Sequence, residues 1–275
     1  MCQNTMDDYN DYSLLTANTG LVNIATGDSS LTPTAPATVL TAAANGTIIK
    51  SVIIKAMEPT TQGMVRLFIV NGSKGTLYKE VPIPIQPEAP ALPVPTPKYT
   101  MFEVMLDGGL KLESGFLLAA TTQNSESFNV IAEGLDWAYP EELPSTCCNF
   151  EQDAAGTGIG TISAATNIDG SSGTIVSIFT ADGAANGALI KAITIKALQS
   201  THPGIVRIYI NDGTDWFLMQ EVSVPQTTQS AFEPSFKQVL NMNYNLQAGY
   251  IIGAATDIAQ SFAITIEATN WTYPV

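Results

Sequence analysis

The sequence predicts an all-β protein: two tandem jelly-roll-like antiparallel β-sandwich domains related by internal duplication. Strand periodicity, closely spaced turn signals and a repeated pattern all indicate this class. In the segment GMVRLFIVNG at 63–72, Val65, Leu67 and Ile69 alternate with Arg66 and Phe68, which is the period-two pattern of a strand with one buried face. An Asn-Gly pair follows at once, and this pair is a strong hairpin signal.

The same pattern recurs in GIVRIYINDG at 204–213, where Val206, Ile208 and Ile210 take the inward positions. Arg207 and Tyr209 take the outward positions, and an Asp-Gly pair takes the turn. Without gaps, residues 45–85 align on 186–226, and residues 112–140 align on 246–274. The intervening loop differs in length, as surface loops tolerate. The chain is therefore one β unit present twice.

The strands predicted for the first copy are short and separated by turn residues, which is the spacing of a sandwich or barrel. No apolar stripe of helical period extends beyond about two turns, so helix content should be low. The predicted strands are Leu21–Ala25, Ala37–Thr41, Thr47–Met57, Met64–Val70, Thr76–Ile83, Thr100–Leu106, Phe116–Thr121 and Ser127–Glu133.

Four segments follow from this pattern. Residues 1–19 form an N-terminal arm, 20–140 the first β-sandwich domain, 141–157 a linker and 158–275 the second β-sandwich domain. The polar arm is either a disordered terminus or a segment that orders against a neighbouring subunit. The Pro-rich loop 82–98 is semi-rigid and extended, and serves as a spacer or as a contact arm on a neighbour.

Charge excludes one class of partner. The formal charge is −14, with 7 basic and 13 acidic side chains in residues 1–140 and 4 and 12 in residues 141–275. Neither half can present the basic stripe that phosphate backbones require, so we expect no direct nucleic-acid binding.

Two further features indicate the cellular compartment in which the chain folds. The N-terminal segment has no apolar h-region, and no apolar run approaches the length of a membrane span, so we expect neither a signal peptide nor membrane association. Cys2, Cys147 and Cys148 form no disulfide framework, which favours folding in a reducing cytosol.

No residue is predicted to be catalytic, cofactor-binding or metal-binding. His202 is the only histidine and precedes a Pro-Gly turn, so it is interpreted as a solvated loop residue with no partner for a metal pair or a catalytic triad. The adjacent Cys147 and Cys148 are interpreted as incidental linker residues. The segment GTGIGT at 156–161 lacks the spacing, the lysine and the following helix of a phosphate loop, and is predicted to be a flexible hinge.

Three charged positions recur in both copies: Arg66 with Arg207, Glu80 with Glu221, and Glu133 with Glu267. In a chain with 13% charged residues, a cross-strand arginine–carboxylate pair would fix strand register on the outer face. We therefore predict that Arg66 contacts Glu80 or Glu133, and that Arg207 contacts the counterpart.

Aromatic residues close each copy, as WAYP at 137–140 and WTYP at 271–274. Side chains of this size most often plug the end of a sandwich. Exposed Trp137 or Trp271 would instead be able to stack on sugar rings.

The order of phrases in the first copy is IKSVIIKA, PTTQGMVRLFIVNG, LYKEVPIP and LESGFLLAATTQNSESFNVIAEGLDW. It resembles a β-sandwich module of structural proteins of tailed bacteriophages, including the capsid-associated or auxiliary capsid proteins of crAss-like phages. The resemblance implies no catalytic residues. The second copy departs from it where FNVIAEG is written FAITIEA, so its last strand is expected to meet different surroundings.

These observations together favour a non-enzymatic structural component of a phage virion that decorates or reinforces the outside of the capsid. Its partners would be the major capsid protein or other virion proteins, with homo-oligomers formed, and it would be synthesised in the host bacterial cytoplasm. An external place is favoured because a −14 chain is repelled by packaged DNA. Two alternatives stay open: a double-jelly-roll major capsid protein, and a carbohydrate-binding fibre or receptor-binding module.

Overall fold

The computed structural model describes residues 14–33, 35–86, 99–138, 152–163, 166–170, 174–183, 187–228 and 235–272. The regular elements in these ranges are all strands. The first half contains β1 (Leu14–Ile24), β2 (Ala37–Thr41), β3 (Thr47–Ala56), β4 (Gly63–Asn71), β5 (Lys74–Ile83), β6 (Met101–Leu112), β7 (Phe116–Thr122) and β8 (Phe128–Ala138). The second half contains β9 (Gln152–Ile162), β10 (Val176–Thr180), β11 (Ala188–Ala197), β12 (Gly204–Asn211), β13 (Trp216–Val224), β14 (Lys237–Leu246), β15 (Ile251–Thr256) and β16 (Phe262–Thr272).

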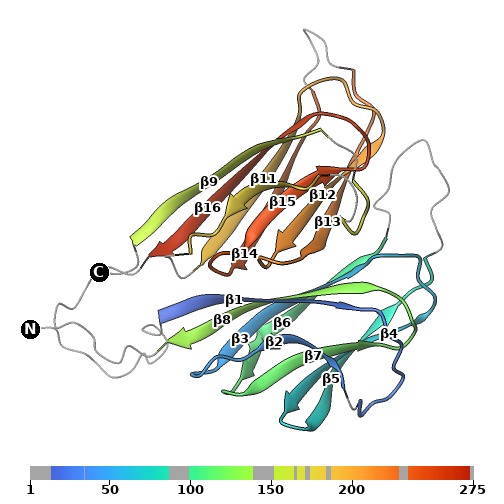
Figure 1. Ribbon diagram of the computed structural model, residues 1–275, viewed down its shortest axis with the longest axis vertical. Coiled ribbons are helices and arrows are strands. Elements are labelled where there is room, and N and C mark those ends of the chain that lie inside the picture. The colour runs from blue at the N-terminus through green and yellow to red at the C-terminus, as the bar shows by residue number, and fades with distance from the viewer. Residues whose placement is uncertain are drawn as a thin grey trace, which may run out of the picture.

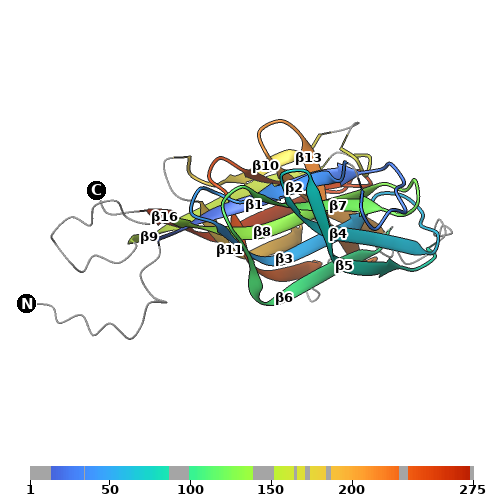
Figure 2. The ribbon, with the colours of Figure 1, turned by 90° about the horizontal axis from the view of Figure 1, so that it is seen from below.

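The strands form four sheets of four strands each, two per half (Figures 1 and 2). Sheet 1A has the order β1-β8-β3-β6, and sheet 1B has the order β2-β7-β4-β5. Sheets 2A (β9-β16-β11-β14) and 2B (β10-β15-β12-β13) repeat these orders. All named strand pairs are antiparallel. Eight strands in two facing sheets, with the first strand beside the last, form a jelly roll, so the predicted class is confirmed.

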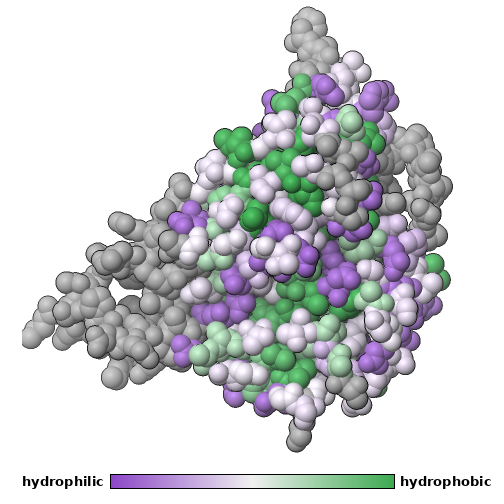
Figure 3. Space-filling model, in the orientation of Figure 1, coloured by the Kyte–Doolittle hydropathy of each residue, from purple (hydrophilic) through white to green (hydrophobic). Residues whose placement is uncertain are grey.

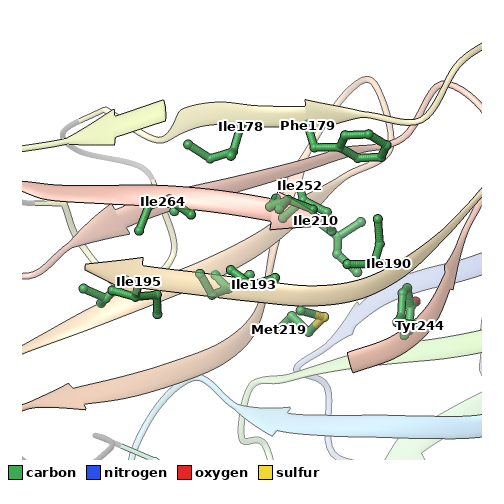
Figure 4. Packing of buried hydrophobic residues seen from close by; sticks show 14 of the residues in the cluster. Ile178, Phe179, Ile190, Ile193, Ile195, Ile210, Met219, Tyr244, Ile252 and Ile264 are labelled. Carbon is green, nitrogen blue, oxygen red and sulfur yellow. The ribbon is translucent and has the colours of Figure 1, made fainter. Parts of the chain in front are cut away.

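Each jelly roll has its own apolar core between its two sheets. Val65 and Leu67 are fully buried in the first core, and Val206 and Ile208 hold the same places in the second. Isoleucines from both sheets interdigitate in the second core, where Figure 4 shows Ile193 and Ile264 of sheet 2A together with Ile210 and Ile252 of sheet 2B. The alternation read from the sequence therefore gives the correct inward faces. The opposite face is buried as well, which the prediction of one buried face did not include: Phe68 and Tyr209 are 0% exposed in two smaller apolar clusters outside the main cores.

Two predicted boundaries need correction. Strand β1 begins at Leu14 and pairs with β8 from there, so residues 14–19, assigned to the arm, are strand. Strand β9 begins at Gln152 and pairs with β16, so residues 152–157, assigned to the linker, are strand as well. Both strands are the first of their jelly roll, and their partner is the last strand of the same copy, a contact that local sequence does not show.

The GTGIGT segment is not a hinge, because residues 156–161 lie inside β9. Its glycines occupy alternate positions facing β10, where space is too small for a side chain. A Cβ at Gly158 would lie 2.5 Å from the Ile178 carbonyl oxygen and 2.7 Å from the Phe179 Cβ. Gly20 occupies the equivalent place in β1, where a Cβ would lie 2.3 Å from the Val39 carbonyl oxygen. Glycine here permits close approach of two backbones.

The predicted turns are present. Gly72 has φ +59° after β4 and Gly213 has φ +98° after β12, the left-handed region that glycine tolerates. The left-handed region is also used at a bulge in β6 and at the equivalent bulge in β14, where Gly109 has φ +75° and Asn243 has φ +48°.

Several predictions fall on residues outside the described ranges. These are residues 1–13 of the arm, residues 87–98 of the Pro-rich loop, all three cysteines, and the side chains of Trp137 and Trp271. The proposed aromatic plugs therefore stay predictions.

Candidate functional site: the interface between the two jelly rolls

The predicted arginine–glutamate pairs are present in both copies. Arg66 Nε lies 2.9 Å from Glu80 Oε1, and Arg207 Nε lies 3.2 Å from Glu221 Oε1. Each pair joins directly opposed positions of neighbouring strands, so it fixes register as expected. The prediction is confirmed for this partner.

Glu133, the other predicted partner of Arg66, lies in a different sheet from Arg66. Arg66 is on β4 of sheet 1B, whereas Glu133 is on β8 of sheet 1A, so the assumed common outer face does not exist. Period-two alternation shows which side of a strand a residue occupies, but it does not show to which of two sheets the strand belongs.

The outer face of sheet 1A is covered by the second jelly roll. Strands β13 and β14, each an edge strand of its own sheet, lie beside β1, β3 and β8, as Figure 1 shows. Ile53 and Ile131 project from this face and join the apolar core of the second jelly roll, with Leu21 beside them. Burial of apolar surface stabilises by roughly 25 cal/mol per Å², so these side chains contribute to holding the two jelly rolls together.

A buried ionic cluster links the two bodies. Lys55 Nζ of β3 lies 2.8 Å from Glu221 Oε2 of β13, and Arg207 takes the other carboxylate oxygen. The side chains of Lys55 and Glu221 are 1% and 0% exposed. Lys55 also donates to the Tyr99 carbonyl oxygen at 2.5 Å, and Arg207 Nη1 donates to the Thr166 carbonyl oxygen at 2.7 Å. The Glu221 carboxylate thus has two cationic partners, and each cation also has a backbone carbonyl acceptor. Such partners offset the cost of removing buried charges from water.

A second polar contact lies on the same face. Glu133 Oε1 accepts from Asn245 Nδ2 at 2.5 Å and from the Asn245 backbone N–H at 3.2 Å, while Ser51 Oγ donates to Glu133 Oε2 at 3.2 Å. Beside it, Thr19 Oγ1 donates to the carbonyl oxygen of Asn245 in β14, and Thr19 exchanges two hydrogen bonds with Gln247, which follows β14. Both carboxylate oxygens of Glu133 therefore have a donor. The second jelly roll supplies the donor to Oε1, and the first supplies the donor to Oε2.

Burial shifts the pKa values of these groups. Removal from water raises the pKa of Glu133 above its usual value, and the donors from Asn245 and Ser51 oppose that shift only in part. Burial lowers the pKa of Lys55, and the negative charge of Glu221 opposes the shift. The buried phenol of Tyr209 has a raised pKa for the same reason.

The equivalent face of the second jelly roll is uncovered. Lys196 and Glu267 stand where Lys55 and Glu133 stand in the first, and both are exposed. Thr194 and Thr265 replace Ile53 and Ile131 and are half-buried. The expectation that the last strand of the second copy meets different surroundings is confirmed.

The remaining candidate positions that the structure describes are His202, a possible metal cluster and one surface cleft. His202 is exposed in its loop, and only its backbone is bonded, to the Gln260 side chain. Within the described ranges, no three His, Cys, Asp or Glu side chains lie together as a metal site. A shallow cleft of about 700 Å³ between the start of β4 and the end of β5 is lined by residues such as Met64, Pro82 and Ile85, with no ionisable side chain. No helix among the described residues is long and apolar enough to cross a membrane.

Comparison with known proteins adds likenesses of fold at low identity. No family model matches the sequence, and no curated protein matches it. Among solved structures, the chain is similar to the PBSX exported protein XepA at 10% identity and TM-score 0.21, with 94% of this chain and 86% of that chain covered.

Two other structures are similar at the same level. The tandem CBM22-1–CBM22-2 domain of Paenibacillus barcinonensis Xyn10C is 11% identical with TM-score 0.26, covering 94% and 93% of the two chains. The major capsid protein P2 of bacteriophage PM2 is 10% identical with TM-score 0.19, covering 93% and 98%. Similarities of this size carry no argument about activity, so the functional assignment depends on the chain's own residues.

Proposed function

We propose that this chain is a non-enzymatic structural component of a phage virion, an auxiliary capsid protein that decorates or reinforces the outside of the head. The observation that carries the proposal is the use made of the charged residues present in both copies. Arg66, Glu80, Arg207 and Glu221 all form pairs that fix strands, and Lys55 and Glu133 join the two bodies. Six of the charged residues that recur in the two copies thus hold strands or jelly rolls together, whereas Lys196 and Glu267 are exposed; this use of charge supports a structural role.

The charge and the composition of the surface support a position on the outside of the phage head. With a net charge of −14, the chain would be repelled by packaged DNA and attracted by basic patches of other virion proteins. The face in Figure 3 shows groups of hydrophobic residues among hydrophilic ones, a mixture compatible with both solvent and a protein neighbour. The partners proposed are the major capsid protein or other virion proteins, and further copies of this chain.

Binding to phage heads tests the proposal directly. Heads assembled from a phage in which this gene is deleted would be mixed with the purified chain, sedimented and imaged by electron cryo-microscopy. We expect density for two joined jelly rolls on the outer surface, at symmetry-related positions. Co-sedimentation that fails, or density confined to the interior, would contradict the proposal.

The same preparation separates the two alternatives named from the sequence. Density forming the continuous shell itself would indicate a major capsid protein. Absence from heads together with a glycan-array signal that Trp137→Ala or Trp271→Ala removes would indicate a carbohydrate-binding module.

A further inference from the structure

The contact between the two jelly rolls is heterologous: a sheet face of the first meets two edge strands of the second. Because the two bodies are copies, each half of this contact has an unused counterpart elsewhere in the chain. The unused face is the outer side of sheet 2A, and the unused edges are β5 and β6. A heterologous contact between like units leaves both ends free to repeat.

The unused face keeps the charges that bind in the covered one. Lys196 corresponds to Lys55 and Glu267 to Glu133, and both side chains are exposed. Thr157 corresponds to Thr19, since each lies opposite the equivalent glutamate in strand register.

The unused edges carry complementary groups at the corresponding places. Glu80 corresponds to Glu221. Arg66 Nε contacts Glu80 Oε1, just as Arg207 Nε contacts Glu221 Oε1. The Oε2 oxygen of Glu80 is then the counterpart of the one that Lys55 contacts. Lys111 corresponds to Asn245, the residue that donates to Glu133, and it is exposed.

We propose that the outer face of sheet 2A binds the β5 and β6 edges of a second copy of this chain, repeating between molecules the contact that joins the two jelly rolls. Lys196 then faces Glu80 of the next copy, as Lys55 faces Glu221. Glu267 faces Lys111 of the next copy, so that the amide–carboxylate contact of Glu133 with Asn245 becomes an ion pair. The match of charge at both positions selects a second copy as the occupant.

The association is weaker than the contact within the chain. Thr194 and Thr265 replace the two isoleucines of the covered face, so less apolar surface is buried. Exposed ion pairs are screened by salt. The assembly is therefore reversible, and its salt dependence combines the screening of these ion pairs with the screening of the repulsion between two chains of charge −14. This inference holds whether or not the chain belongs to a virion.

A charge-exchange experiment tests the pairing of Glu267 with Lys111. Sedimentation velocity at several salt concentrations would compare the unaltered chain with Lys111→Glu and Glu267→Lys. Each single variant places like charges opposite each other and is expected to raise the dissociation constant at least roughly tenfold. An equimolar mixture of the two variants, or the double variant, restores opposite charges at every contact and is expected to restore association.

Matched controls carry new charges at the opposite edges of the B sheets, where Thr38 on β2 and Ser177 on β10 are exposed. Thr38→Glu and Ser177→Lys are expected to leave the dissociation constant unchanged. An unaltered chain that stays monomeric up to its solubility limit would overturn the proposal, as would single variants that associate normally or a mixture that fails to recover.

Cross-linking tests the geometry independently of the charges. Gln247 lies 3.1 Å from the Thr19 backbone nitrogen within the chain, and the corresponding intermolecular pair is Glu113 with Thr157. In chains whose native cysteines are replaced by serine, mixing Glu113→Cys with Thr157→Cys is expected to give a disulfide-linked heterodimer under oxidation. Yields no higher than those of each variant alone, or than a Thr38→Cys and Ser177→Cys mixture, would overturn it.

Discussion

The outer face of the A sheet is covered in the first jelly roll and exposed in the second. In the first jelly roll, Lys55 and Glu133 are 1% and 7% exposed beneath the second. In the second jelly roll, Lys196 and Glu267 occupy the same positions and lie in solvent. Both copies have the charges, whereas the second copy has threonine where the first has Ile53 and Ile131. The apolar neighbours, rather than the charges, therefore distinguish a covered face from a free one, as expected when hydrophobic area is the main driving force of association.

The largest expected difference between the copies concerns the two equivalent glutamates. Glu221→Gln leaves Lys55 and Arg207 buried without their shared carboxylate, and is expected to cost about 3–5 kcal/mol of unfolding free energy. Glu80→Gln removes a pair whose glutamate side chain is 41% exposed, and is expected to cost at most about 1 kcal/mol. Denaturant unfolding of both variants measures the difference; equal losses would contradict the assigned burial.

The apolar part of the interface gives the next effect. Ile131→Thr introduces into the first copy the residue that the second copy has at Thr265, and is expected to cost about 1.5–3 kcal/mol because a fully buried side chain is lost. Thr265→Ile is the matched exchange on the free face and is expected to leave the unfolding free energy within about 0.5 kcal/mol. A stable Ile131→Thr variant would show that this contact does not hold the bodies together.

A third comparison concerns a feature that the copies share. Gly20→Ala and Gly158→Ala each place a methyl group within 2.5 Å of a carbonyl oxygen of the neighbouring strand, and each is expected to cost about 1–3 kcal/mol through overpacking. Thr157→Ala, on the solvent side of the same strand, is the control and should have little effect. Thermal unfolding would measure all three; a tolerated Gly158→Ala would show that β10 does not approach β9 closely enough to exclude a side chain.

The smallest effect is pH-dependent. Because burial raises the pKa of Glu133, the folded chain binds this proton more tightly than the unfolded chain does. The stability that this proton contributes is present below the unfolded pKa and is lost as pH rises through the folded pKa. Glu133→Gln cannot ionise, so it is expected to be up to about 1 kcal/mol more stable than the unaltered chain at neutral pH, with no such gain in acid.

Unfolding free energies measured across the acid range would check this expectation, with Glu267→Gln as the exposed control that changes nothing. A Glu133→Gln variant destabilised equally at all pH values would show that hydrogen-bond geometry at Asn245 outweighs the cost of burying the charge.

Much of the fold could be predicted from the sequence because its signals are local. Alternation at 63–72, turn glycines and the internal repeat give the strands and the duplication, and the Arg66–Glu80 contact joins neighbouring strands of one hairpin. The interface could not be predicted, because Lys55 and Glu221 are far apart in the sequence and belong to different jelly rolls. Residue periodicity gives information only within a strand. The prediction of a hinge at GTGIGT is wrong because glycine usually signals a turn, whereas here the close approach of β10 accounts for glycine inside a strand.

Lysine acetylation of the native chain tests the central claim most directly, because Lys55 and Lys196 are chemically alike and differ only in whether the face around them is covered. Limited treatment with acetic anhydride, read by mass spectrometry, is expected to modify Lys196 rapidly and to leave Lys55 unmodified until denaturant is added. Equal modification of the two lysines under native conditions would contradict the account, since it would mean that the first face is as open to solvent as the second.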